Sequence, residues 1–125
     1  MKRSKSKGNG LILYGIKNCN TMKAAMYWLE QHDVPFDFHD YKVKGITSEK
    51  LNEWSIQVGW EALVNKRGTT WKQLEKHVQD SIVDQASAFT LIQEKTSIIK
   101  RPLMEEDGKI IALGFEESVY SNKFS

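Results

Sequence analysis

Hydrophobic positions follow two different periods along the chain, and the change of period separates strand segments from helical segments. Residues 11–14, LILY, form a continuous apolar run before Gly15, the pattern of a strand buried on both faces. The next apolar positions recur at helical spacing up to a turn near residues 32–35, and they are Met22, Ala25, Met26 and Leu29. Residues 36–41, FDFHDY, alternate again and predict a second strand. A strand, a helix and a strand with short connections predict a right-handed βαβ unit with parallel strands.

The middle of the chain, residues 46–98, has helical spacing throughout. One predicted helix ends at Gly59. Its inward face is expected to consist of Leu51, Trp54 and Val58. After the loop at 65–70 the same spacing continues in Trp71, Leu74 and Val78. A further helix is expected from Asp84 to Lys95, with inward positions Ala88, Leu91 and Ile92. This segment is therefore predicted to be a helical insert between β elements.

The last part of the chain returns to strands. Asp107 and Gly108 lie between two β-prone runs, LMEE at residues 103–106 and KIIAL at residues 109–113. An Asp-Gly pair in this position is a strong hairpin signal. A closing helix over 115–124 is expected to pack through Phe115, Val119 and Tyr120. The predicted order is β-α-β, a helical insert and β-β-α, which is the order of a thioredoxin-like core.

Composition and charge limit the class of protein. The chain has 125 residues, 40% of them hydrophobic and 27% charged, which fits one globular domain with a real core. The net charge is +2, but four cations and no acid fall in the first ten residues, so the rest carries −2 and does not predict a nucleic-acid surface. Residues 1–10 are expected to be a flexible basic tail, 11–45 and 99–125 the core, and 46–98 the insert within one structural domain. No stretch approaches a membrane span of about 20 apolar residues.

The only cysteine, Cys19, lies where the first strand gives way to the first helix. A free thiol has a pKa of about 8.5, and the backbone N–H groups at a helix N-terminus and nearby cations lower it. The alternative is that Cys19 packs as a small apolar residue. Its position after a buried strand, where α/β proteins bind ligands, favours a nucleophile instead. So do its polar neighbours, which are Lys17, Asn18, Asn20 and Thr21.

Two arginines are further candidates for the site. An X-Pro bond before a strand can be cis where a loop turns beside a site, and Arg101-Pro102 precedes a predicted strand. Arg101 would then bring a guanidinium to Cys19, whereas an exposed arginine before a trans proline is the alternative. Arg67 lies in the loop NKRGTT, and spacing alone favours its interpretation as a solvated surface charge. The three histidines have no metal-ligand spacing, and we predict no metal site.

Five segments together resemble one known family. They are YGIKNCNTMKAA, FHDYK, GWEALVNKRGTTW, IIKRP and LGFEESVY, and they run in order from about residue 11 to 124. The chain resembles the arsenate reductase (ArsC)/Spx-like family, and most closely its YffB-type members. The resemblance implies an α/β, thioredoxin-like core with an inserted helical subdomain, Cys19 as the active cysteine and Pro102 as a cis-proline.

The resemblance implies three functions within this family. Arsenate reductases use the cysteine with three arginines, of which Arg101 matches one and Arg67 lies two positions from another. Gly114 and Gly15 stand where that enzyme has its third arginine and a histidine, which argues against arsenate reduction. Spx-type regulators bind RNA polymerase and sense oxidation through a Cys-x-x-Cys pair, whose second position here is Met22.

A single activated cysteine must take its second thiol from outside the chain. The expected function is therefore a glutathione-dependent monothiol reductase, in which Cys19 forms a mixed disulfide that glutathione resolves. Arg101, Pro102, Arg67, Lys17, Asn18, Asn20 and Thr21 are the expected binding residues. We expect no bound cofactor, glutathione as co-substrate, and glutaredoxin or an oxidised protein or small molecule as a further partner. With one cysteine and no membrane segment, we expect a cytoplasmic monomer.

Overall fold

A computed structural model describes residues 10–124, so all of the predicted basic tail except residue 10 lies outside the described residues. The described chain forms two compact units. The sheet unit contains residues 10–44 and 101–124, and the helical unit contains residues 45–100. Among the described residues, no helix is long and apolar enough to span a membrane.

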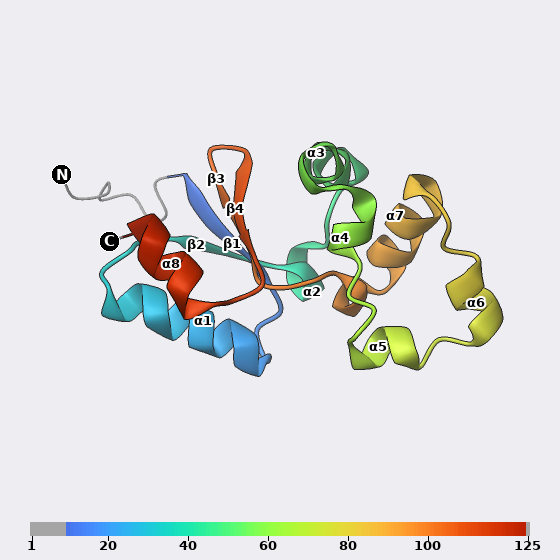
Figure 1. The fold of residues 1–125 in the computed structure, drawn as a ribbon, viewed down its shortest axis with the longest axis horizontal. Helices are drawn as coiled ribbons and strands as arrows, with labels where there is room; N and C mark the ends of the chain where they lie inside the picture. The colour runs from blue at the N-terminus through green and yellow to red at the C-terminus, as the bar shows by residue number, and fades with distance from the viewer. Residues whose placement is uncertain (1–9, 125) are drawn as a thin grey trace. The chain divides into compact units, whose positions relative to one another are not determined.

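The sheet unit is built on a four-stranded sheet in the order β2-β1-β3-β4 (Figure 1). The strands are β1 (Leu11–Gly15), β2 (Asp37–Asp40), β3 (Leu103–Glu106) and β4 (Lys109–Leu113). β1 pairs parallel with β2, as the predicted βαβ unit requires, and antiparallel with β3. β3 and β4 form the predicted hairpin, in which Asp107 and Gly108 have φ values of 51° and 85°. Both values lie in the left-handed region that hairpin turns of this length require.

One face of the sheet carries the main core of this unit. α1 (Asn20–Gln31) and α8 (Glu117–Phe124) pack there, and Trp28 of α1 meets Tyr120 of α8 edge to face at 5.5 Å between ring centroids (Figure 1). Tyr120 also packs edge-on against Phe115 at 4.8 Å. The prediction that Val119 is a packing contact of the closing helix is wrong, since this residue is 39% exposed. Residues 119 and 120 lie about 100° apart around a helix, so only one of them can point at the core.

The second strand ends earlier than predicted. β2 stops at Asp40, and Tyr41 begins the short helix α2 (Tyr41–Lys44). The Asp40 side chain explains this, because its Oδ1 accepts the backbone N–H of Lys42 at 2.9 Å. A carboxylate that bonds the backbone two residues on replaces the strand ladder with a turn.

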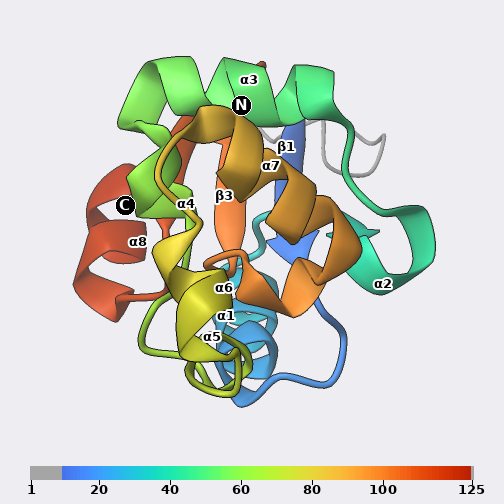
Figure 2. The same ribbon diagram turned by 90° about the vertical axis from the view of Figure 1, so that its right-hand side faces the viewer.

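The helical unit contains α3 (Ser48–Val58), α4 (Trp60–Leu63), α5 (Thr69–Lys72), α6 (Lys76–Asp80), α7 (Gln85–Glu94) and the 3₁₀ turn η1 (Thr96–Ile98). α3, α4 and α7 contact one another around Leu51, Trp54 and Ile92, which are fully buried (Figure 2). α7 begins with a capping box in which Asp84 and Ser87 satisfy each other's backbone N–H groups. The predicted inward face of this helix, Ala88, Leu91 and Ile92, is buried and confirmed.

Two predictions for the helical unit are wrong. Val58 is 38% exposed, because it is the last residue of α3 and the chain turns away at Gly59, where φ is 85°. The helix expected across Trp71, Leu74 and Val78 is two short helices, α5 and α6, separated by extended backbone at Glu75. Three apolar positions in eight residues do not distinguish one helix from two single turns, and short helices gain little stability from propensity.

Candidate active site

Cys19 is the N-cap residue of α1, directly after the turn that follows β1. Its backbone is extended, with φ −124° and ψ 130°, and its carbonyl oxygen accepts the N–H of Lys23 at 2.9 Å. The side chain is only partly buried and packs at the edge of the core below the sheet. The cysteine therefore has apolar support on one side and access to solvent on the other.

Three groups act together on the Cys19 thiol. Partial burial raises its pKa, but the backbone N–H groups of Met22 and Thr21 and the guanidinium of Arg101 outweigh burial and lower the pKa below its ordinary value. The amide contacts to Sγ are looser than a conventional N-cap hydrogen bond, which the side chain does not make. The orphan N–H groups of the first helical turn thus favour the thiolate by their orientation.

Arg101 reaches Cys19 from the segment that leads into β3. The Arg101-Pro102 peptide bond is cis, as the sequence predicted, and the carbonyl of Pro102 accepts the N–H of Gly114 at 2.7 Å. Pro102 is buried and Arg101 is half-buried. The structure thus brings Arg101 and Cys19 into one site within the sheet unit, and Pro102 is the next residue after Arg101.

The polar residues beside Cys19 contribute less than their sequence positions suggested. Lys17, Asn18 and Asn20 are exposed, and within residues 10–124 none of their side chains bonds the sulfur. Thr21 contributes through its backbone N–H. The backbone of the helix start, rather than a set of side-chain donors, therefore forms the inner part of the site.

Gly15, at the end of β1, faces the side chain of Met22. A Cβ added at Gly15 would collide with Met22 Sδ, lie 2.5 Å from its Cε and 3.1 Å from its Cγ. Real Cβ atoms do not approach other atoms so closely, so Met22 occupies the space that a side chain at position 15 would need. Gly15 and Met22, both buried, are therefore in close contact, one on each side of Cys19 in the sequence.

A buried polar group that the sequence did not reveal lies on the sheet near this site. The hydroxyl of Tyr14 donates to Oε1 of Glu105 at 3.0 Å, and both residues are nearly fully buried. Tyr14 also stacks on Tyr41 at 6.1 Å and meets His39 at 4.7 Å. Burial raises the pKa of Tyr41 well above its ordinary value, while the charge of Arg101 acts in the opposite direction. Tyr14 and Glu105 share a face because β1 pairs with β3, a register that the sequence does not reveal.

Arg67 belongs to the helical unit. Its backbone N–H donates to Oδ1 of Asn65 at 3.2 Å, and its exposed side chain borders a hollow together with Lys66 and Lys100. Residues 10–124 contain no group of His, Cys, Asp and Glu side chains suited to hold a metal ion.

An α/β fold with a helical insert and one cysteine at a strand-to-helix turn defines a thioredoxin-like protein of the arsenate reductase type. The sequence model of the ArsC family matches residues 14–122, and the chain belongs to that family.

Its relatives include solved structures and regulators. A solved structure of a YffB protein is 40% identical, covers 92% of this chain and 99% of its own, and has a TM-score of 0.84. An arsenate reductase (ArsC) related protein from Brucella melitensis is 42% identical over 98% of both chains, with a TM-score of 0.75. The global transcriptional regulator Spx of Lactiplantibacillus plantarum is 26% identical, over 86% of this chain and 80% of its own. These comparisons confirm the ArsC/Spx-like, YffB-type resemblance and the predicted fold.

Proposed function

We propose that this protein is a glutathione-dependent monothiol reductase whose nucleophile is Cys19. The observation that carries the proposal is the position of Cys19 at the N-terminus of α1, where the amides of Thr21 and Met22 and the guanidinium of Arg101 lower its pKa. A thiolate is the form of cysteine that attacks disulfides, so a lowered pKa makes the residue reactive near neutral pH. Membership in the ArsC family supports redox chemistry at this position.

The proposed reaction has two exchange steps when the substrate is a mixed disulfide of glutathione. The Cys19 thiolate attacks the glutathione sulfur, forms a new S–S bond to it and releases the substrate thiolate, which takes up a proton. The thiolate of a second glutathione then attacks the same glutathione sulfur and releases the Cys19 thiolate. The substrate disulfide is reduced, and two glutathione units leave as one glutathione disulfide.

Arg101 has two roles in this proposal. It stabilises the Cys19 thiolate in the resting protein and again when that thiolate is the leaving group of the second step. A guanidinium remains charged at all working pH values and offers several donors, so it can hold a thiolate or a carboxylate of glutathione. Pro102 follows it through a cis peptide bond and is buried. Arg67, in the helical unit, is also proposed to bind glutathione.

The test is a covalent adduct on the intact protein. Incubation with glutathione disulfide should add one glutathione to the chain by intact mass, and excess glutathione should remove it. Cys19→Ser should form no adduct and should lose all turnover of a glutathionylated substrate, while its circular dichroism stays unchanged. An adduct that forms only far above neutral pH, or a wild-type thiol with an ordinary pKa, would contradict the proposal.

Arsenate reduction is the alternative enzyme activity, and the site argues against it. The buried Gly15 offers no side chain, and Met22 fills the space beside it. Gly114 likewise carries no cation, and its φ of 92° disfavours any larger residue. Arsenate turnover with glutathione that disappears in both Cys19→Ser and Arg101→Ala would favour this alternative over a disulfide substrate.

RNA polymerase binding is the alternative of a different class, and the similarity to Spx regulators supports it. Met22 stands at the second position of the Cys-x-x-Cys pair, so an internal disulfide cannot form in this chain. Co-purification with RNA polymerase that persists in Cys19→Ser would support an interaction protein. If RNA polymerase does not co-purify with the wild-type protein, this alternative is contradicted.

A further inference from the structure

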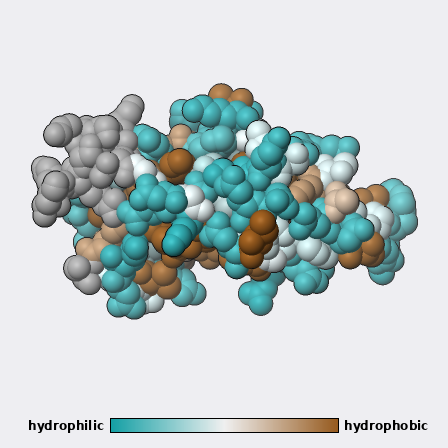
Figure 3. Space-filling model, turned by 90° about the horizontal axis from the view of Figure 1, so that it is seen from above, coloured by the Kyte–Doolittle hydropathy of each residue, from teal (hydrophilic) through white to brown (hydrophobic). Residues whose placement is uncertain are grey.

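The sheet unit contains a buried carboxylate that the proposed mechanism does not use. Glu105 of β3 is 2% exposed and is the only buried charged side chain among the described residues. Charged side chains ordinarily stay at the surface, as on the largely hydrophilic face shown in Figure 3. Removing a carboxylate from water is costly unless hydrogen bonds and an opposite charge compensate it. Glu105 therefore needs compensating partners inside the protein.

Strand pairing gives Glu105 its hydrogen-bond donor. Leu13 of β1 and Met104 of β3 belong to the main core. The next residue of each strand, Tyr14 and Glu105, therefore lies on the opposite face of the sheet. Glu105 pairs with Ile12, and the Tyr14 hydroxyl reaches its Oε1 along the diagonal of the strand pair at 3.0 Å. One hydroxyl satisfies part of the carboxylate but does not neutralise its charge.

Arg101 is a cation near this pair. Burial raises the pKa of Tyr41, and the charges of Arg101 and Glu105 act on that pKa in opposite directions. The Tyr41 hydroxyl is buried and, within residues 10–124, has no hydrogen-bond partner, so it bonds neither of them. Arg101 also interacts with the Cys19 thiol, by a side-chain hydrogen bond and by its charge. The same guanidinium is thus within electrostatic reach of the surroundings of Glu105 and of the Cys19 sulfur.

We propose that Glu105 is a positioning residue for Cys19, and that its carboxylate and the Cys19 sulfur share the Arg101 guanidinium. A guanidinium has five N–H donors in a fixed planar arrangement, so it can serve two anions at once. Each anion weakens the effect of Arg101 on the other, because it offsets part of the positive charge. Tyr14 sets this balance by holding the carboxylate on its face of the sheet.

The shared guanidinium has a consequence for the proposed reaction. Cys19 is an anion in the resting protein and is neutral in the mixed disulfide. The carboxylate of Glu105 is present in both states, so Arg101 keeps an anionic partner while Cys19 carries glutathione. The guanidinium is then in place when the Cys19 thiolate leaves. This consequence rests on the proposed function, whereas the sharing of Arg101 in the resting protein does not.

The test is the pH dependence of Cys19 alkylation by iodoacetamide in the full chain. Glu105→Gln keeps the size of the side chain and an oxygen for the Tyr14 hydroxyl but removes the charge. The midpoint of alkylation should move to lower pH, because Arg101 then acts on Cys19 alone. Tyr14→Phe keeps the carboxylate, which takes a larger share of Arg101 without the hydroxyl, so the midpoint should move to higher pH. A loss of structure alone would move both variants in the same direction, toward the ordinary pKa of a thiol.

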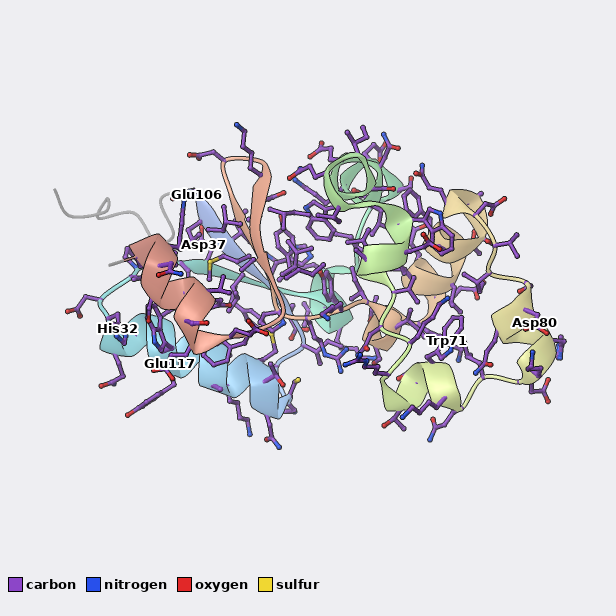
Figure 4. All side chains as sticks on the ribbon, in the orientation of Figure 1. His32, Asp37, Trp71, Asp80, Glu106 and Glu117 are labelled. Carbon is purple, nitrogen blue, oxygen red and sulfur yellow. The ribbon has the colours of Figure 1, made fainter. Side chains whose placement is uncertain are left out.

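Two matched controls remove similar groups that the proposal does not use. Tyr41→Phe removes a buried hydroxyl that, within the described part of the chain, makes no hydrogen bond. Glu106→Gln removes the next carboxylate of β3, which is labelled in Figure 4 and pairs with Lys123 at 3.3 Å. Both variants should have the wild-type midpoint.

The double variant Glu105→Gln/Arg101→Ala shows whether Glu105 acts through Arg101. Its midpoint should equal that of Arg101→Ala, whereas a carboxylate that acts directly on Cys19 would affect the midpoint in both backgrounds. His39→Gln removes the titratable ring whose centroid lies 4.7 Å from that of Tyr14. This change should leave the shift caused by Glu105→Gln as it is.

An unchanged or raised midpoint in Glu105→Gln would overturn the proposal. So would shifts of the same sign in Glu105→Gln and Tyr14→Phe, an equal downward shift in Glu106→Gln, or a downward shift by Glu105→Gln in the Arg101→Ala background. If the midpoints move as expected but glutathione forms no adduct on the protein, the proposed function fails and the positioning role stands. An adduct that forms while Glu105→Gln keeps the wild-type midpoint gives the reverse result.

Discussion

The cysteine site and the cationic hollow arrange positive charge in two different ways. Around Cys19, much of the electrostatic effect comes from backbone N–H groups of residues 21 and 22, which the first turn of α1 fixes. In the hollow, the charge sits on the exposed ends of Lys66, Arg67 and Lys100. Backbone dipoles are positioned by the fold without side-chain entropy cost, whereas exposed cations are mobile and screened by salt. The cysteine site should therefore respond to changes in packing and the hollow to changes in charge and ionic strength.

The largest expected effect tests whether the two units depend on each other. Leu51 is fully buried in the helical unit, and Leu51→Ala should lower the free energy of unfolding by about 2–5 kcal/mol through the lost burial and the cavity. Hydrogen exchange should show the loss of protection within residues 45–100. The Cys19 pKa should stay unchanged under folding conditions, because Thr21, Met22 and Arg101 all lie in the sheet unit. A pKa that returns to its ordinary value in Leu51→Ala would show that the units do not act separately.

A smaller effect is expected where packing supports the cysteine turn. Gly15→Ala should destabilise the protein by about 1–3 kcal/mol, because its Cβ meets the Met22 side chain. It should also raise the Cys19 pKa by displacing the Met22 amide. The double variant Gly15→Ala/Met22→Ala should lose less stability than the two single variants added together, which denaturant unfolding of all four proteins measures. Additive losses would mean that residues 15 and 22 do not compete for the same space.

The smallest of these effects concerns charge alone. Arg101→Ala should raise the pKa of Cys19, since an adjacent opposite charge favours the thiolate. The rate of iodoacetamide alkylation of the wild type should rise with pH, because the thiolate is the reacting form. The midpoint of this rise should lie below the ordinary pKa of a cysteine thiol. In Arg101→Ala this midpoint moves upward, and alkylation at neutral pH slows because less of the thiol is ionised. Arg67→Ala is the matched control, and an equal shift in that variant would contradict the assignment of the effect to Arg101.

The sequence indicated where to look for the cysteine site because part of it is local. Cys19 and the amides that act on it lie within four residues, and Arg101 was marked by the proline after it. The hollow was not predicted, because Lys100 reaches it only through the bridge between Val64 and Ile99. The same limit applies to Tyr14 and Glu105, which are 91 residues apart and meet only through strand pairing. The end of β2 was missed for another reason, since the Asp40 side chain overrides the alternation that continues into Tyr41.

The contact between Gly15 and Met22 also constrains how this chain can diverge. A side chain at position 15 meets the Met22 side chain, so Met22 has to shift or be replaced by a smaller residue. A change at position 15 alone is therefore expected to cost stability. Lineages that differ at one of these positions should therefore differ at the other, so the two positions are expected to covary across the family as a linked pair of substitutions.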